Sequence, residues 1–127
     1  MTGERVECIA LICVRAQMLE AEKIEHLERR QEKLIREYAK KHGIRIVDVV
    51  YCRGLGQFCV NEKFNDIVAM IQKGRVQGLI VNDMKTISAG LADAYGKVGK
   101  VRSAGGEMIT VNEGSLKLNI RSKFYGK

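Results

Sequence analysis

The feature that most constrains the fold is the alternation of short apolar segments with longer segments of helical periodicity. The segment Val6–Val14 (VECIALICV) is almost continuously apolar and rich in β-branched residues, which is typical of a strand buried on both faces. Three further strands are predicted at residues 44–51, 79–81 and 108–111. Strands that alternate with helices of ten residues or more predict a mainly parallel sheet. We therefore expect a three-layer α/β fold in which helices cover both faces of a four-stranded sheet.

Three amphipathic helices are predicted between these strands. The first follows Gln17 and ends at Gly43, the second is capped by Asn61 and ends at Gly74, and the third covers residues 91–103. In each helix, apolar residues recur at spacings of three and four, which marks the face that packs on the sheet. These inward-facing residues are Ile24, Leu27, Gln31, Leu34, Ile35 and Tyr38 in the first helix, Phe64, Ile67, Val68 and Ile71 in the second, and Leu91, Ala94, Tyr95, Val98 and Val101 in the third.

The length and composition suit one compact domain. The chain has 127 residues, of which 46% are apolar, and we assign the domain to residues 1–115. Residues 116–127 are predicted to be a basic tail or a short extra strand that makes the sheet five-stranded, because Leu116, Leu118 and Ile120 alternate with polar residues. No apolar run reaches the roughly 20 residues of a spanning helix, and the N-terminus does not resemble a signal peptide. We therefore expect a cytoplasmic protein without membrane contact.

The four cysteines do not indicate a metal centre or a disulfide framework. No pair has the Cys-x-x-Cys spacing of zinc sites, and three of the four lie in apolar or mixed surroundings, which favours buried thiols. The two histidines lie among charged residues, where we expect a solvent-exposed face. The sequence thus predicts no metal site and no cofactor. The residues concerned are Cys8, Cys13, Cys52, Cys59, His26 and His42.

The net charge of +7 is concentrated towards the C-terminus. Residues 84–127 carry eight Lys or Arg against three Asp or Glu, whereas residues 1–43 and 44–83 are each nearly neutral. Such a basic excess is typical of proteins that contact nucleic acid, and it is also a common solubilising surface. Composition alone favours the solubilising role.

Polar residues follow each predicted strand at its carboxyl end. In a parallel sheet these ends share one edge, where ligands bind in folds of this class. Arg15 and Gln17 follow the first strand, and residues 51–57, 82–89 and 112–115 follow the other three. We expect any functional site at this edge.

The order of these segments resembles the catalytic domain of the serine recombinases, the resolvase and invertase family, over about residues 6–115. Residues 10–17 (ALICVRAQ) are similar to the family's opening strand, which typically reads Tyr-x-Arg-Val-Ser. Other segments are similar to its following helices and strands. They are residues 31–39 (QEKLIREYA), 64–71 (FNDIVAMI), 74–84 (GRVQGLIVNDM) and 111–115 (VNEGS). The resemblance implies a resolvase-like fold, an origin in bacteria or mobile elements, and assembly as a dimer or with another recombinase.

The resemblance fails at the positions that carry the family's chemistry. Family members cleave DNA by serine attack on a phosphodiester, and several arginines surround the scissile phosphate because its transition state needs fixed positive charge. Here Arg15 is kept, but Gln17 replaces the nucleophile, and a primary amide cannot attack a phosphodiester. Asn61, Thr86 and Ala89 stand where further arginines are usual. The resemblance therefore implies a pseudoenzyme with no intact catalytic site.

The leading hypothesis is an inactive module of site-specific recombination or DNA integration. It would bind DNA weakly and without sequence preference, or assemble with protein partners. The candidate DNA-contacting residues are Arg15, Lys85, Lys117, Arg121 and Lys123.

Two alternatives come from other functional classes. The domain could still act on DNA, either beside an intact subunit or through a relocated nucleophile. Ser88 is the candidate for that nucleophile, since no serine precedes it in the chain. The domain could also be an α/β module that binds a small anion at Gly54-Leu55-Gly56, although that motif lacks a third glycine. Arg15 also has a purely structural alternative, an ion pair with Asp83 or Glu113.

Overall fold

The computed structural model describes residues 6–14, 20–53 and 56–116 of the chain. Strands and helices alternate along it, as the sequence predicts. The elements are β1 (Val6–Val14), α1 (Ala21–Lys41), β2 (Ile44–Arg53), α2 (Gly56–Gln72), β3 (Gly78–Val81), the 3₁₀ turn η1 (Met84–Thr86), α3 (Leu91–Ser103), β4 (Glu107–Thr110) and β5 (Gly114–Leu116).

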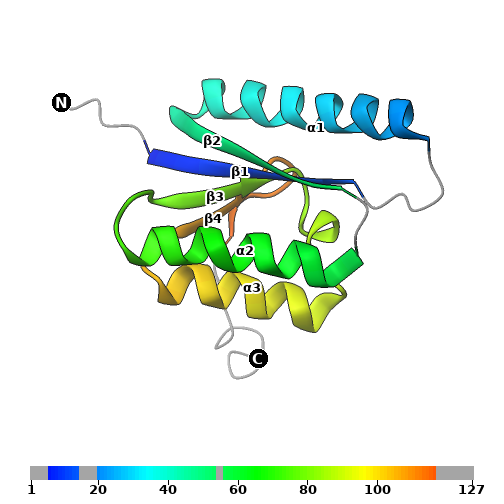
Figure 1. Ribbon diagram of the computed structural model, residues 1–127. Helices are drawn as coiled ribbons and strands as arrows, with labels where there is room; N and C mark the ends of the chain where they lie inside the picture. Colours follow the sequence, from blue (N-terminus) through cyan, green and yellow to red (C-terminus); the bar gives the residue numbers. More distant parts are fainter. Residues whose placement is uncertain (1–5, 15–19, 54–55, 117–127) are drawn as a thin grey trace, which may run out of the picture.

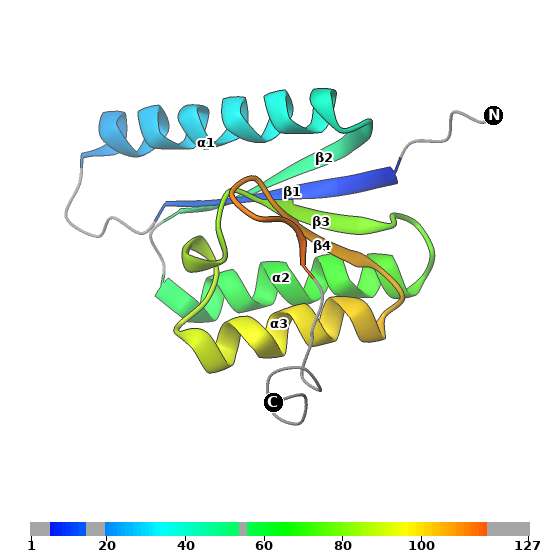
Figure 2. The ribbon, with the colours of Figure 1, turned by 180° about the vertical axis from the view of Figure 1, so that it is seen from behind.

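These elements form three layers around a five-stranded sheet with the order β2-β1-β3-β4-β5. The first four strands are parallel, and β5 pairs antiparallel with β4 at one edge. Helix α1 covers one face of the sheet, and α2 and α3 lie side by side on the other (Figures 1 and 2). The expected α/β architecture is therefore confirmed, with the fifth strand that the sequence allowed.

The alternation of side chains along β1 divides the core into two parts. Ile9, Leu11 and Cys13 belong to the cluster on the side of α2 and α3, whereas Cys8, Ala10 and Ile12 belong to the cluster under α1. Because a strand directs successive side chains to opposite faces, only an apolar run such as β1 can fill both clusters. β1 is therefore an interior strand of the sheet that contributes side chains to both parts of the core.

Helix α1 ends as predicted. The residue after its C-cap, Gly43, has φ +68°, a left-handed conformation that glycine adopts without a steric penalty. The chain then turns directly into β2, which extends two residues beyond the predicted strand. This extension carries Cys52 to the carboxyl edge of the sheet.

Three details of the predicted helices are wrong. Helix α2 begins at Gly56, so Asn61 lies within its second turn and does not cap it. Leu91 is 73% exposed because it is the first residue of α3, and Leu34 of α1 is 38% exposed. The buried face of α3 instead includes Lys97, whose charge is compensated by Asp93.

None of the helices in the described ranges has both the length and the apolar content that a membrane-spanning helix needs.

Candidate functional site at the carboxyl edge of the sheet

The carboxyl ends of the parallel strands meet the first turns of α2 and α3 at one edge of the molecule. The segment between β3 and α3, residues 82–90, lies beside these helix starts and contains η1, as both ribbon views show (Figures 1 and 2). This is the edge at which the sequence predicts a site. Its polar side chains form three connected groups.

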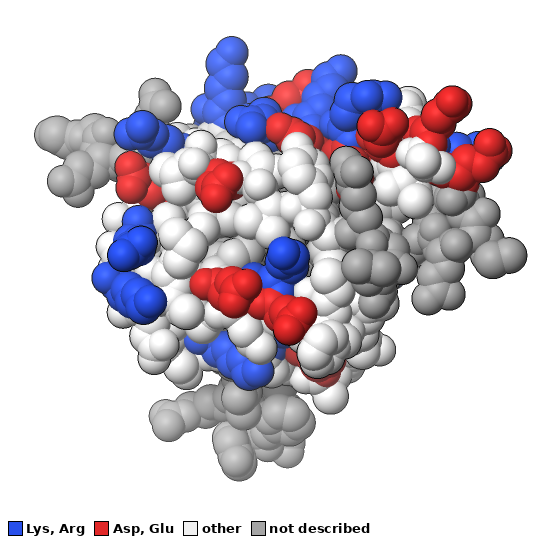
Figure 3. Space-filling model, in the orientation of Figure 1, with Lys and Arg blue, Asp and Glu red and all other residues white. Residues whose placement is uncertain are grey.

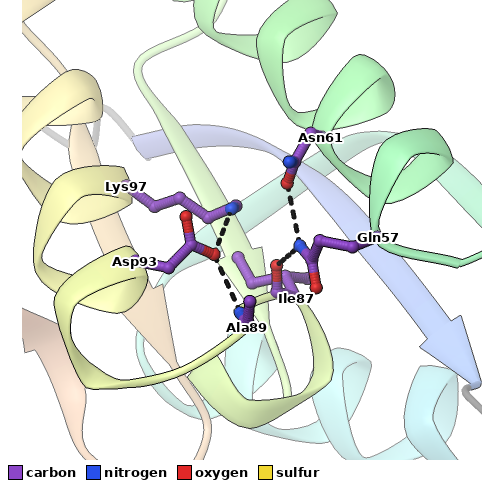
Figure 4. A network of polar contacts seen from close by, with 6 residues as sticks. All are labelled: Gln57, Asn61, Ile87, Ala89, Asp93 and Lys97. Carbon is purple, nitrogen blue, oxygen red and sulfur yellow. Dashed lines mark hydrogen bonds and ion pairs between the residues drawn. The ribbon is translucent and has the colours of Figure 1, made fainter.

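The first group joins α2 to the segment after β3. The side-chain amide nitrogen of Gln57, Nε2, donates to Oδ1 of Asn61 at 2.8 Å and to the backbone oxygen of Ile87 at 2.9 Å (Figure 4). Gln57 lies one residue into α2, so its amide reaches across to the neighbouring segment. One neutral side chain thus holds Asn61 and Ile87 together.

The second group anchors the start of α3. Oδ2 of Asp93 accepts a hydrogen bond from the backbone nitrogen of Ala89 at 2.9 Å. The same oxygen forms an ion pair with Nζ of Lys97 at 2.6 Å (Figure 4). Nζ of Lys97 also lies 5.5 Å from the centroid of the Phe64 ring, a cation-π distance. Lys97 thereby lowers the pKa of Asp93, with a smaller contribution from the Ala89 hydrogen bond.

The third group shapes η1 itself. Asp83 caps this turn, because its Oδ1 accepts from the backbone nitrogen of Lys85 at 3.0 Å and its Oδ2 accepts from Nδ2 of Asn112 at 2.8 Å. The hydroxyl of Thr86 donates to the backbone oxygen of Asp83 at 2.7 Å. The carboxylate of Asp83 therefore joins the turn after β3 to the turn after β4.

These contacts place three of the predicted site residues at one edge. Gln57 brings Asn61 to the segment that contains Thr86 and Ala89, and the two ends of that segment are held by Asp83 and Asp93. Arg15 and Gln17 lie outside the described residues. At the three described positions, the side chains are a neutral amide, a hydroxyl engaged with the backbone, and a methyl group. None of them can stabilise the charge of a phosphodiester transition state as a guanidinium does.

Ser88, the alternative nucleophile, lies at this edge in an unsuitable environment. Its Oγ is buried and has no hydrogen-bond partner in the described part of the chain. A serine needs an adjacent base to become a nucleophile. Among the described residues, no base accepts a hydrogen bond from Ser88.

Two hollows open on either side of the segment after β3. The larger, about 920 Å³, lies at the start of α3 and is bordered by apolar side chains such as Leu91, Tyr95, Val98 and Leu116. The smaller, about 420 Å³, lies between α1 and the ends of β1 and β3. Lys85 lines both of them.

The smaller hollow combines two cations with two amides. Arg30 and Lys85 line it together with Gln31 and Asn82. Nε2 of Gln31 donates to the backbone oxygen of Cys13 at 2.8 Å, whereas Oε1 of Gln31 and Oδ1 of Asn82 are buried without a partner among the described residues. The sequence gives Gln31 only a packing role, because helical spacing cannot reveal that its amide reaches the end of β1.

The basic C-terminal part of the chain is not one surface within the described residues. Lys97 is 3% exposed and paired with Asp93, so it cannot contact a large external ligand. Lys100 and Arg102 lie in the last turn of α3, at the opposite end of the helix from the site. Figure 3 shows charged side chains of both signs crowded over α1 and fewer of them over the face in front. Of the candidate DNA-contacting residues only Lys85 is described, and it is exposed at the site.

The remaining predictions concern thiols and metals. All four cysteines are thiols; Cys8, Cys13 and Cys52 are buried, and Cys59 is half-buried. No cluster of His, Cys, Asp or Glu suited to a metal ion occurs in the described ranges. The sequence placed Gln57 at this edge, as the last residue of the segment 51–57, but did not reveal its contacts, and it did not identify Asp93 or Lys97 as site residues. The spacing of Asp93 and Lys97, four apart on a helix, is the signal that could have indicated their ion pair.

Solved structures of other proteins share the fold of this chain. No family model matches the chain, and no curated protein matches it in sequence. A solved structure of a resolvase family site-specific recombinase from Streptococcus pneumoniae is similar over 94% of this chain and 82% of its own, with a TM-score of 0.74 and 16% identity. The chain has the fold of a serine recombinase catalytic domain.

Two other solved structures share this resolvase-like fold. The N-terminal catalytic domain of TP901-1 integrase matches 93% of this chain and 87% of its own, with a TM-score of 0.64 and 15% identity. The C-terminal catalytic domain of ISC1926 TnpA, an IS607-like serine recombinase, matches 84% and 70%, with a TM-score of 0.64 and 13% identity. The fold expected from the sequence is thereby confirmed.

Proposed function

We propose that this resolvase-like domain does not cleave DNA and acts as a DNA-associated or protein-assembly module in recombination. The observation that carries the proposal is the chemistry of the carboxyl edge of the sheet. Asn61, Thr86 and Ala89 occupy the positions where the family resemblance places arginines, and Gln57 and Asp93 hold their segments in place by hydrogen bonds. Loss of one such charged donor commonly costs about 2.7–4 kcal/mol of transition-state stabilisation. Because several arginines are replaced, binding rather than cleavage is the favoured role of the carboxyl edge of the sheet.

Exposed apolar side chains support a role in assembly. Phe58 in the first turn of α2 and Leu91 at the start of α3 are 75% and 73% exposed. Both helix starts lie at the site edge, and the larger hollow begins beside Leu91. Large apolar side chains near an apolar hollow are typical of protein contact surfaces.

The cations of the smaller hollow support a weak contact with DNA. Arg30 and Lys85 come from different elements, and both line this hollow. Two cations neutralise few phosphates, so binding should be weak, indifferent to sequence and sensitive to salt.

The first experiment tests for cleavage and covalent attachment. The protein is incubated with supercoiled and linear DNA, and the products are separated on a denaturing gel. We expect neither strand cleavage nor a protein-DNA adduct. A phosphoserine-linked product would overturn the proposal, and the variant Ser88→Ala would then show whether Ser88 is the nucleophile.

The second experiment tests the binding edge with matched lysines. Affinity for DNA is measured against salt concentration for Lys85→Gln and for Lys100→Gln, both exposed lysines of which only Lys85 lies at the site. We expect Lys85→Gln to lower the slope of log K against log salt by up to about one unit and Lys100→Gln to change it little. Equal effects would show that DNA does not bind at this edge.

The third experiment tests assembly. An active serine recombinase is mixed with this chain, and product yield and complex size are measured. We expect a stable mixed complex, weakened by Phe58→Ser or Leu91→Ser. Absence of both a complex and DNA binding would refute the proposal as a whole.

A further inference from the structure

Three of the four thiols meet at the carboxyl end of the sheet. Cys13 of β1 and Cys52 of β2 are directly opposite each other in the parallel register. Both belong to the core cluster on the side of α2, and Cys59, in the first turns of α2, packs against the same cluster. Cys8 lies apart in the cluster under α1.

The three thiols differ in burial. Burial is the main cause that raises the pKa of Cys52 to about 11, and the interaction with Cys59 adds to the increase, whereas the contact with Cys13 lowers the pKa. Cys13 and Cys52 are buried, and Cys59 is the half-buried member of the group.

The different burial of the thiols suggests that two of them act in successive steps of an oxidation. An oxidant reaches a half-buried sulfur more readily than one that is 2% exposed, as Cys52 is. Cys52 belongs to the core cluster against which Cys59 packs, so its thiol is placed to resolve the oxidised product. We propose that Cys59 is a site of oxidation by peroxides, and that Cys52 converts the product into an intramolecular disulfide.

The two steps balance as a two-electron oxidation. The sulfur of Cys59 attacks one oxygen of hydrogen peroxide, so that an S–O bond forms and the O–O bond breaks, and the leaving hydroxide takes up the thiol proton of Cys59 to become water. The sulfur of Cys52 then attacks that of Cys59: the S–S bond forms, the S–O bond breaks, and the hydroxide leaves as water with the thiol proton of Cys52. Two thiols are oxidised and one peroxide is reduced to two waters.

The disulfide would fix the connection between β2 and α2 at the site edge. It closes a ring over residues 52–59, which includes Gln57, the residue that holds Asn61 and Ile87. Oxidation would therefore restrain the start of α2 where the exposed Phe58 also lies. The thiols would react in this way whether or not the domain binds DNA.

The test is a peptide map of the oxidised protein. The folded protein is treated with a small excess of hydrogen peroxide, unfolded, alkylated and digested with trypsin. Cleavage after Arg45, Arg53 and Lys63 places Cys52 in residues 46–53 and Cys59 in residues 54–63. We expect a disulfide-linked pair of these two peptides, lighter than their sum by two hydrogen atoms and lost on treatment with dithiothreitol.

Variants distinguish this pairing from other oxidation chemistry. Cys59→Ser, at a half-buried position, should abolish the linked pair, and Cys52→Ala should leave Cys59 as a sulfenic acid that a dimedone probe labels. Cys8→Ala, which changes a thiol outside the group, should leave the yield unchanged. Circular dichroism of each reduced variant confirms that it is folded. A disulfide between residues 6–15 and 46–53, a disulfide-linked dimer, or an alkylated Cys52 beside an oxidised Cys59 would each overturn the proposal.

Discussion

Nζ of Lys97 lies 2.6 Å from Oδ2 of Asp93, and the two side chains are unequally buried, at 4% and 35% exposure. Water therefore still reaches the carboxylate, whereas the ammonium depends on the protein for compensation. The aromatic face of Phe64 supplies part of it. The pair is a cation buried at the site edge and held there by a half-exposed anion.

Because Lys97 is more deeply buried than Asp93, substitution of the two residues should lower the free energy of unfolding by different amounts. Asp93→Ala removes the partner of a buried cation and should lower the free energy of unfolding by about 3 kcal/mol. Lys97→Met leaves a carboxylate that can be hydrated, and should lower it by about 1 kcal/mol. Urea unfolding of both variants and of the double variant measures the difference. The double variant should resemble Lys97→Met; a larger effect of Lys97→Met than of Asp93→Ala would contradict the assignment of Lys97 as the buried partner.

The same ion pair predicts a dependence of stability on pH. The pKa of Asp93 in the folded protein lies below its ordinary value of 3.8, mainly because of Lys97. A carboxyl group with a lowered pKa stabilises the fold above its unfolded pKa, and this contribution is lost as the pH falls through the folded pKa. The free energy of unfolding of the native chain should therefore fall more steeply below pH 4 than that of Asp93→Asn. Asp66→Asn, at an exposed position of α2, is the matched control for the removal of one carboxylate.

The strands and helices were predictable because periodicity and apolar content decide them. The run that became β1 could fill only a buried strand, and the glycine that became the αL residue after α1 marks a helix end by its conformational freedom. The start of α2 was misplaced because Asn61 suits a cap by residue type, whereas the chain had already entered the helix at Gly56. Propensity gives only a weak indication of where a helix begins.

The site was predictable in position but not in its contacts. The edge itself follows from parallel topology, which fixes where the strand ends meet. The reach of Gln57 from α2 to Ile87 depends on how far apart two segments lie after packing, and no local pattern encodes that distance. Lys97 was counted as part of a basic surface because charge is read from composition, whereas its burial depends on Phe64 and Asp93.

The contact of Gln57 with Ile87 predicts a local effect on the segment after β3. Gln57→Ala removes both amide hydrogen bonds and should lower local stability by about 1 kcal/mol, which corresponds to roughly five-fold faster hydrogen exchange of residues 84–90. Hydrogen-deuterium exchange with mass spectrometry measures this rate. Gln72→Ala, at the exposed end of the same helix, is the control and should leave the segment unchanged. Equal exchange in both variants would show that Gln57 does not hold the segment.

Two glycines predict opposite effects of the same substitution. A Cβ on Gly78 of β3 would lie 2.8 Å from the backbone oxygen of Glu107 and 2.9 Å from Sγ of Cys8, whereas a Cβ on Gly96 of α3 would have no atom within 4 Å. Gly78→Ala must therefore push two strands of a packed sheet apart and should lower the free energy of unfolding by about 1–3 kcal/mol. Gly96→Ala adds no contact and restricts the unfolded chain, so it should raise the free energy by about 0.5–1 kcal/mol. Thermal and urea unfolding of the two variants measure both changes, and a Gly78→Ala variant as stable as the native chain would contradict the close packing of β3 between β1 and β4.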